Sequence, residues 1–131
     1  MTRTPAQRRG DAAEALVADR LVAAGWRVLG RQVRVGRDEL DLVAVDPGPP
    51  GRLVAVEVRM RARRDFGLAE ETFDYAKRRR VRRAMLGLVG LGALPDGTRL
   101  PRLSVAIDLV VVEPGRGPGD PARIRHHRDV G

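Results

Sequence analysis

The sequence contains no cysteine, a single lysine and few aromatic residues. The lack of cysteine excludes disulfide bonds and thiolate zinc sites, which suits a reducing cytoplasm. Scarce aromatic side chains give little support for a platform that stacks unpaired bases. No apolar run reaches the length of a membrane span, about eighteen residues, and the charged N-terminus lacks the apolar core of a secretion signal. We therefore expect a cytoplasmic protein that does not enter a membrane.

What the sequence has in excess is positive charge. Its 25 basic and 17 acidic residues give a net charge of +8, and the isoelectric point is near 11.4. A GC-rich genome would explain why 24 of the basic residues are arginine, but not why they outnumber the acids. This balance predicts attraction to nucleic acid, most simply duplex or branched DNA contacted at its phosphates. Whether the protein forms a homodimer stays open.

Hydrophobic periodicity and chain breakers predict a single domain over residues 1–131, of the α/β class. Its mixed β-sheet should be flanked by helices on both sides, in the order αβββαβ. Helices are expected at about 5–24 and 73–91, and strands at 26–35, 37–46, 52–61 and 103–113. The short turn after the second strand predicts an antiparallel pair, and the helical crossover predicts that the last long strand is parallel to a neighbour. From about residue 114 we expect a flexible tail, in which 123–130 could form a short edge strand.

Acidic residues interrupt the two most apolar strands. Asp41 lies in the second strand and Glu57 in the third, where an unpaired carboxylate would be costly to bury. Glu14 falls on the apolar stripe of the first helix, and Lys77 on that of the second. Internal salt bridges, such as Asp41 with Lys77, would explain each residue by itself. A divalent cation explains the set better, because clustered carboxylates repel one another and oxygen ligands suit Mg²⁺ or Mn²⁺.

Several short motifs occur in a fixed order between about residues 8 and 113. They are Ala13-Glu14, Asp38-Glu39-Leu40-Asp41-Leu42, Val56-Glu57-Val58-Arg59, Lys77-Arg78-Arg79-Arg80 and Ile107-Asp108-Leu109-Val110. In this order they resemble the YraN-like uncharacterised protein family, which is similar to PD-(D/E)XK nucleases and to archaeal Holliday-junction resolvases.

The resemblance implies a restriction-endonuclease-like core that hydrolyses phosphodiester bonds in structured DNA with the help of a metal ion. Asp41 and Glu57 would hold Mg²⁺ or Mn²⁺, with the Val58 carbonyl as a third ligand and Glu14 acting directly or through water. The ion would polarise the phosphate and lower the pKa of a bound water.

One position departs from the nuclease motif. The motif has a lysine where this chain has Arg59, and a guanidinium can bind phosphate but cannot accept a proton. Either catalysis was weakened by this change, or the lysine's role has moved to Lys77, the only lysine in the chain. The alternative for Lys77 is a side chain that merely snorkels from the first turns of its helix.

Other basic residues near these motifs are the expected contacts to nucleic acid: Arg61, Arg63, Arg64, Arg79, Arg82 and Arg83. Two other functions stay open, a catalytically impaired nucleic-acid-binding protein with the same fold and a protein-interaction module with a ribosomal or membrane-associated partner. We expect Asp108 to be structural and paired with an arginine. Adjacent residues of a strand point to opposite faces, so His126 and His127 make a poor metal pair, and we expect both in solvent.

Overall fold

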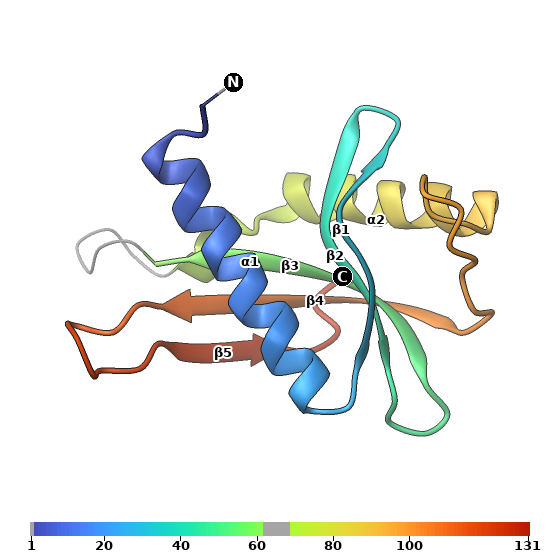
Figure 1. Cartoon of the computed structure of the whole chain (residues 1–131). Helices are drawn as coiled ribbons and strands as arrows, with labels where there is room; N and C mark the ends of the chain where they lie inside the picture. Colours follow the sequence, from blue (N-terminus) through green and yellow to red (C-terminus); the bar gives the residue numbers. More distant parts are fainter. Residues whose placement is uncertain (1, 62–68) are drawn as a thin grey trace.

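A computed structural model describes residues 2–61 and 69–131. Two α-helices, five strands and a short 3-10 helix make up the fold (Figure 1). Their bounds, in chain order, are α1 (Pro5–Ala23), β1 (Arg27–Val35), β2 (Asp38–Asp46), β3 (Arg52–Met60), η1 (Ala69–Thr72), α2 (Tyr75–Leu91), β4 (Ser104–Glu113) and β5 (Arg123–His127). Neither helix in this part of the chain is long and apolar enough to cross a membrane.

The five strands form one mixed sheet in the order β1-β2-β3-β4-β5. β2 and β3 are antiparallel, and β3 and β4 are parallel, so both pairing predictions are confirmed. The α/β class, the mixed sheet and the order of the elements are confirmed as well. The segment from residue 114, which we expected to be a flexible tail, includes β5, and β5 pairs with β4 in antiparallel fashion.

The sheet is covered by one helix on each face: α1 crosses in front of the strands in Figure 1 and α2 lies behind them. Alternate residues of β3 pack into the α2-side core and the α1-side core. Leu53 belongs to the core cluster that contains Met85 of α2, whereas Val54 belongs to the cluster that contains Val17 of α1. A strand buried on both faces needs apolar residues at every position, which explains why β3 reads as a continuous apolar run. Glu57 interrupts that run.

Both helices begin with a side chain that caps the first turn. The Thr4 hydroxyl accepts a hydrogen bond from the backbone N–H of Gln7, whose side chain bonds back to the N–H of Thr4. The Asp74 carboxylate accepts from the backbone N–H of Lys77 at 2.9 Å. Such caps satisfy N–H groups that a helix start leaves unpaired. The Asp74 cap therefore fixes where α2 begins, and with it the position of Lys77 in the first turn.

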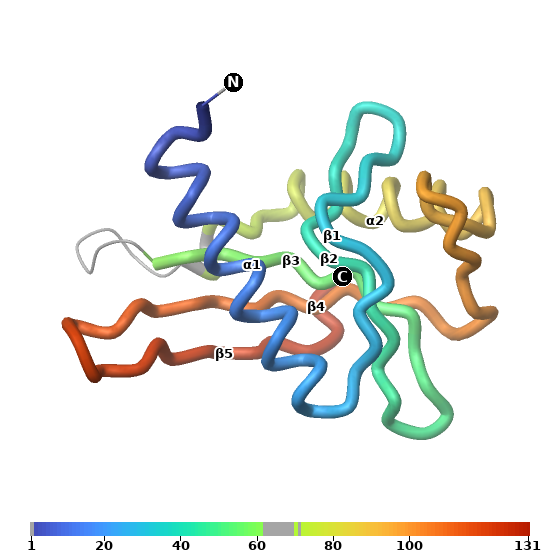
Figure 2. The backbone as a smooth tube through the Cα atoms, in the orientation of Figure 1, coloured from blue at the N-terminus to red at the C-terminus, as the bar shows by residue number. Residues whose placement is uncertain are grey.

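β2 changes its neighbours at Asp41. Its ladder with β3 runs from Asp46 back to Leu42 and stops there, whereas its ladder with β1 continues to Asp38. The end of the β1–β2 hairpin therefore separates from β3, and Figure 2 shows the hairpin turn rising away from that strand. Leu40 belongs to the core cluster on the α2 side and Leu42 to the cluster on the α1 side. The regular alternation of the strand is thus interrupted at Asp41.

Candidate functional site

Asp41 and Glu57 lie where β2 and β3 part, and their side chains take over the hydrogen bonds between the strands. The backbone N–H of Val58 donates to Oδ2 of Asp41 at 2.9 Å. The backbone N–H of Asp41 donates to Oε2 of Glu57 at 3.1 Å. Each carboxylate thus accepts from the opposite strand, which fixes its orientation and satisfies an otherwise unpaired donor.

Lys77 brings a positive charge to this pair. Its ammonium nitrogen lies 3.7 Å from Oε1 of Glu57. The Glu57 side chain is fully buried, whereas that of Lys77 remains 27% exposed. The sequence predicts inward-facing positions for both residues, and the structure pairs Lys77 with Glu57 rather than with Asp41. The ammonium group therefore sits between the buried acid and solvent, where it can meet an incoming phosphate.

Glu14 approaches the same region from α1. It is partly buried, and its Oε1 atom has no hydrogen-bond partner in the described part of the chain. Oε1 of Glu57 likewise accepts no hydrogen bond there, although Lys77 lies near it. A buried carboxylate oxygen without a donor is costly, so both atoms are suited to a cation that binds through oxygen.

The electrostatics of the three acids support this interpretation. Burial raises the pKa of Glu57 to about 7, and the negative charge of Asp41 adds to the rise. Burial likewise raises the pKa of Glu14 to about 7, again with a contribution from Asp41. The pKa of Asp41 is also raised, chiefly by burial, although the hydrogen bond from Val58 opposes this. Three acids that are difficult to ionise together favour a shared positive charge.

The acids do not form a closed metal cage. Within residues 2–61 and 69–131, no three acidic, histidine or cysteine side chains are grouped closely enough to hold a metal ion by themselves. Asp41 and Glu57 offer a pair of carboxylates at the point where β2 and β3 part.

Val58 and Arg59 differ from the simplest form of the expected site. The Val58 carbonyl, expected as a third metal ligand, accepts a hydrogen bond at 3.3 Å from the guanidinium of Arg59. Arg59 therefore lies beside the acids, but its side chain turns back toward its own strand. A long bond of this kind is weak, so the guanidinium can exchange it for a phosphate oxygen.

The arginines predicted to contact nucleic acid lie in several places. Arg61 donates to Oε1 of Glu113 at 3.3 Å, just beyond the end of β3. Arg83 is paired with Asp38 of the hairpin at 3.0 Å. Arg79 and Arg82 line a depression together with Tyr75, and the guanidinium of Arg79 lies over the Tyr75 ring. Arg63 and Arg64 fall outside the described residues.

A second charged cluster, not recognised as a unit in the sequence, holds the C-terminal segment. Fully buried Asp108 accepts from the backbone N–H of Asp129 at 2.9 Å and lies 2.8 Å from Nε2 of His126. Arg128 bridges Asp108 and the buried Asp46. The prediction that Asp108 pairs with an arginine is confirmed; His126 is exposed, as expected, and its ring also bonds Asp108. No local pattern could indicate this cluster, because its members are far apart in the chain.

A third charged cluster fixes η1 to β5. Arg125 binds Glu70 at 2.7 Å and also pairs with Glu113. His127 bonds Glu70 at 2.8 Å, so it too has a partner other than solvent. The guanidinium of Arg125 holds the pKa of Glu70 down at about 2. His126 and His127, adjacent in β5, bond different partners: His126 bonds Asp108 and His127 bonds Glu70.

Comparison with known proteins identifies the family. Residues 13–112 match the model of the uncharacterised protein family UPF0102. This chain belongs to the UPF0102 family. A UPF0102 protein of Symbiobacterium thermophilum is 41% identical over 83% of this chain and 85% of its own length. A UPF0102 protein of Roseiflexus castenholzii is 36% identical over 78% of this chain and 82% of its own length. One of Bordetella petrii is 38% identical over 91% of this chain and 71% of its own length.

The stretch matched to the UPF0102 family contains all the residues of the candidate site. It begins just before Glu14, includes Asp41, Glu57 and Lys77, and ends within β4. The residues of β5 that hold the C-terminal segment follow it. The membership of the family expected from the ordered motifs is thereby confirmed.

Proposed function

We propose that this UPF0102 protein is a metal-dependent endonuclease that hydrolyses phosphodiester bonds in structured DNA. The observation that carries the proposal is the buried Glu57, held beside Asp41 where β2 and β3 part and capped by Lys77 at 3.7 Å. A fully buried acid with a raised pKa is a common feature of functional sites. The resemblance of the ordered motifs to PD-(D/E)XK nucleases supports the same reaction class, and the mixed sheet with a helix on each face is compatible with it.

Asp41 and Glu57 would hold Mg²⁺ or Mn²⁺, with Glu14 acting through water and the Val58 carbonyl available once Arg59 leaves it. A bound ion of this kind polarises the scissile phosphate and increases the acidity of a bound water. Within the chain, the hydrogen bonds from the strand backbone fix the two carboxylates before substrate arrives. Such preorganisation is what makes electrostatic stabilisation effective.

Lys77 and Arg59 divide the roles that a single motif lysine has in related nucleases. Lys77 lies near Glu57, and its ammonium group can orient the attacking water; it can take a proton from that water only after it has given up one of its own. Arg59 stays protonated, so its contribution is to bind phosphate and to stabilise the negative charge of the transition state. Arg61, with Arg63 and Arg64 beyond the described residues, extends this positive charge along the chain toward a DNA backbone.

One observation favours a second function. Arg59 stands where the motif has a lysine, which is the change expected in a protein that binds nucleic acid but no longer cleaves it. Such a protein would keep a binding affinity that falls steeply with salt, because phosphate contacts release counterions. It would show no cleavage with any divalent metal ion.

A cleavage assay with a matched pair of variants separates the two functions. Linear duplex and four-way-junction DNA are incubated with Mn²⁺ and with wild type, Glu57→Gln or Asp19→Asn. Glu57→Gln keeps a hydrogen-bond acceptor while removing the charge, and Asp19 is an exposed acid of α1. We expect wild type and Asp19→Asn to cut and Glu57→Gln to be inactive. Equal cutting by all three would identify a contaminating nuclease, and salt-sensitive binding without cutting would favour the second function.

A further inference from the structure

One groove beside α2 gathers nearly all the large apolar side chains that the described residues leave exposed. Val22 on α1 is the exception. The others line three depressions beside α2, two of which share Arg82 and Gly131: Tyr75, Leu86, Val89, Leu91 and Val105. Single exposed apolar residues are ordinary, but a contiguous set marks a surface that another molecule covers.

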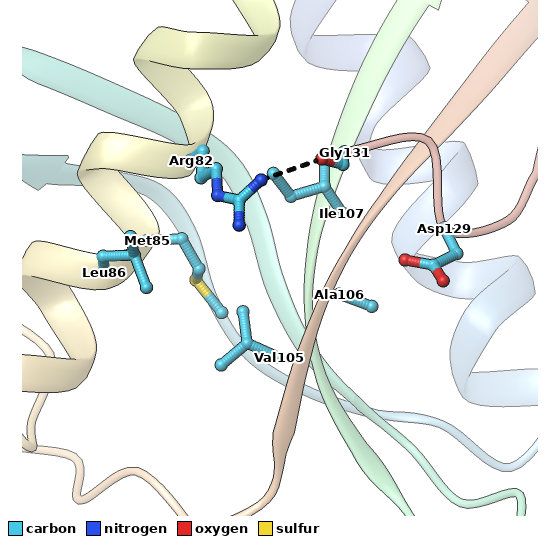
Figure 3. A pocket seen from close by; sticks show the side chains of 8 residues that line it. All are labelled: Arg82, Met85, Leu86, Val105, Ala106, Ile107, Asp129 and Gly131. Carbon is cyan, nitrogen blue, oxygen red and sulfur yellow. Dashed lines mark hydrogen bonds between the residues drawn. The ribbon is translucent and has the colours of Figure 1, made fainter.

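The groove has two walls. α2 forms one wall, and the start of β4 together with the C-terminal residues forms the other. In its middle section, Met85 of α2 and Val105 of β4 line the same depression, and Arg82 reaches across to the carbonyl of Gly131 at 3.4 Å (Figure 3). Toward the end of α2 the groove continues past Val89 to the loop before β4.

The charges along the groove are almost all positive. Its lining contains a single acid, Asp129, against five arginines: Arg78, Arg79, Arg82, Arg99 and Arg102. Among residues 2–61 and 69–131, the ion pairs formed by arginine involve other positions, so no carboxylate side chain in this part of the chain neutralises these five guanidinium groups. Arg79 instead lies over the Tyr75 ring, and Arg82 bonds a carbonyl.

These two properties select the class of occupant. A nucleic-acid backbone would match the arginines but would leave Leu86, Val89 and Val105 against charged phosphates. A second copy of this chain would bring arginines against arginines across a symmetric contact, between molecules of net charge +8. We propose that the groove binds an acidic segment of another protein, one that places apolar side chains on Leu86, Val89 and Val105 and carboxylates near the arginines.

The two parts of the surface would contribute differently to binding. The apolar middle supplies affinity, because anchoring side chains there leave water. The arginines around it increase the rate of association and select an acidic partner. Arg79 and Arg82 are the only lining residues that we also expected to contact nucleic acid, and neither the acids of the candidate site nor Lys77 line the groove. The inference therefore does not depend on the proposed nuclease activity.

Binding of synthetic peptides to the full chain tests the inference. The probe is a fluorescein-labelled helical peptide of glutamate and leucine, with the leucines on one face, and its control has the same composition in scrambled order. The protein variants are Leu86→Ser with Val89→Ser in the groove, and Val22→Ser as the matched exposed position on α1. All three are surface changes, and thermal unfolding checks that each variant is folded.

We expect fluorescence anisotropy to show that the ordered peptide binds at least ~10-fold more tightly than the scrambled one. The double variant should lose ~10-fold or more in affinity, and Val22→Ser should leave the affinity unchanged. Equal binding of both peptides, or equal loss in both variants, would show that only net charge is recognised and would overturn the proposal. The proposal also fails if neither peptide binds. It fails as well if the double variant weakens the binding of duplex DNA or anionic vesicles but not that of the ordered peptide.

Discussion

The ammonium nitrogen of Lys77 lies 3.7 Å from Oε1 of Glu57, an atom that accepts no hydrogen bond from the described residues. Glu57 is fully buried, so its charge is compensated mainly by this one cation from α2. Removing the partner of a buried charge is far more costly than breaking a surface pair. Position 77 therefore affects both the stability of the site and any reaction that takes place in it.

Lys77 should be more important for cleavage than Arg59. We expect Lys77→Ala to reduce the Mn²⁺-dependent cleavage rate by about 10²–10⁴-fold, the typical contribution of a positioned acid–base group. Lys77→Arg keeps the positive charge and should still be slow, because a guanidinium does not take up protons from water. Single-turnover cleavage rates on junction DNA measure the effects of both substitutions.

Arg59→Lys restores the usual nuclease motif and serves as the reciprocal variant. If position 59 limits the reaction, this variant cuts faster than wild type, whereas a role moved to Lys77 leaves the rate unchanged. Folding of every variant is checked by thermal unfolding, since loss of Lys77 leaves a buried acid without its cation. Folded but inert wild type, Lys77→Ala and Arg59→Lys proteins would contradict the nuclease proposal.

Millimolar Mn²⁺ should raise the melting temperature of the wild-type protein by several degrees. Bound as proposed, the ion would reduce the repulsion among Asp41, Glu57 and Glu14 in the folded state only, and a ligand at about 100 times its Kd stabilises by about 2.7 kcal/mol. Differential scanning fluorimetry with and without Mn²⁺ measures the shift. Glu57→Gln should respond much less than Asp19→Asn, and identical responses would count against the site.

Stability without metal should fall as the pH rises from about 4.5 to 7. The pKa of Glu57 is raised from 4.5 to about 7, so in this range the folded state binds a proton that the unfolded state has released. Protons then favour folding, and this contribution is present below pH 4.5 and lost as the pH passes 7. Urea unfolding at several pH values should show the slope; Glu57→Gln should reduce it, and the part that remains comes from Glu14, whose pKa is also raised to about 7.

The structural cluster around Asp108 gives a prediction that is independent of catalysis. Asp108→Ala removes the acceptor for the backbone of Asp129 and for the side chains of His126 and Arg128. Loss of such a buried network should lower the free energy of unfolding by about 2–4 kcal/mol. Urea denaturation measures this, with Asp19→Ala as the exposed control, expected within about 0.5 kcal/mol of wild type. A similar change in the free energy of unfolding of both variants would show that the cluster around Asp108 does not stabilise the fold.

The parts of the fold that follow from local pattern could be predicted from the sequence. Period-two alternation put Glu57 and Arg59 on one face of β3, and period 3.6 put Lys77 on the inner stripe of α2. The short turn before β3 and the helical crossover before β4 then gave the pairing of the central strands. These signals act over a few residues, so they can be recognised without knowing the rest of the structure.

The remaining features depend on contacts between distant segments. The hydrogen bond from the Val58 backbone to the Asp41 side chain requires the pairing of β2 and β3 to end just before Asp41. No spacing of residues in either strand indicates where that pairing ends. Arg128 meets Asp46 across 82 positions of the chain, and β4 has to lie between β3 and β5 before Asp108 can join them. The groove beside α2 also stayed hidden, because its second wall is built from β4 and from residues after β5.

Asp41 and Glu57 accept backbone hydrogen bonds at the point where the sheet opens, so both acids are also part of its architecture. A relative that does not cut DNA would still lose stability on replacing either one, and selection for folding alone would retain them. Their presence in a relative is therefore weak evidence that the relative is active. Positions 59 and 77 are more informative. The side chain of Arg59 makes only a long hydrogen bond to its own strand. Lys77 could be replaced by a neutral or shorter residue in a relative in which Glu57 does not need to be charged.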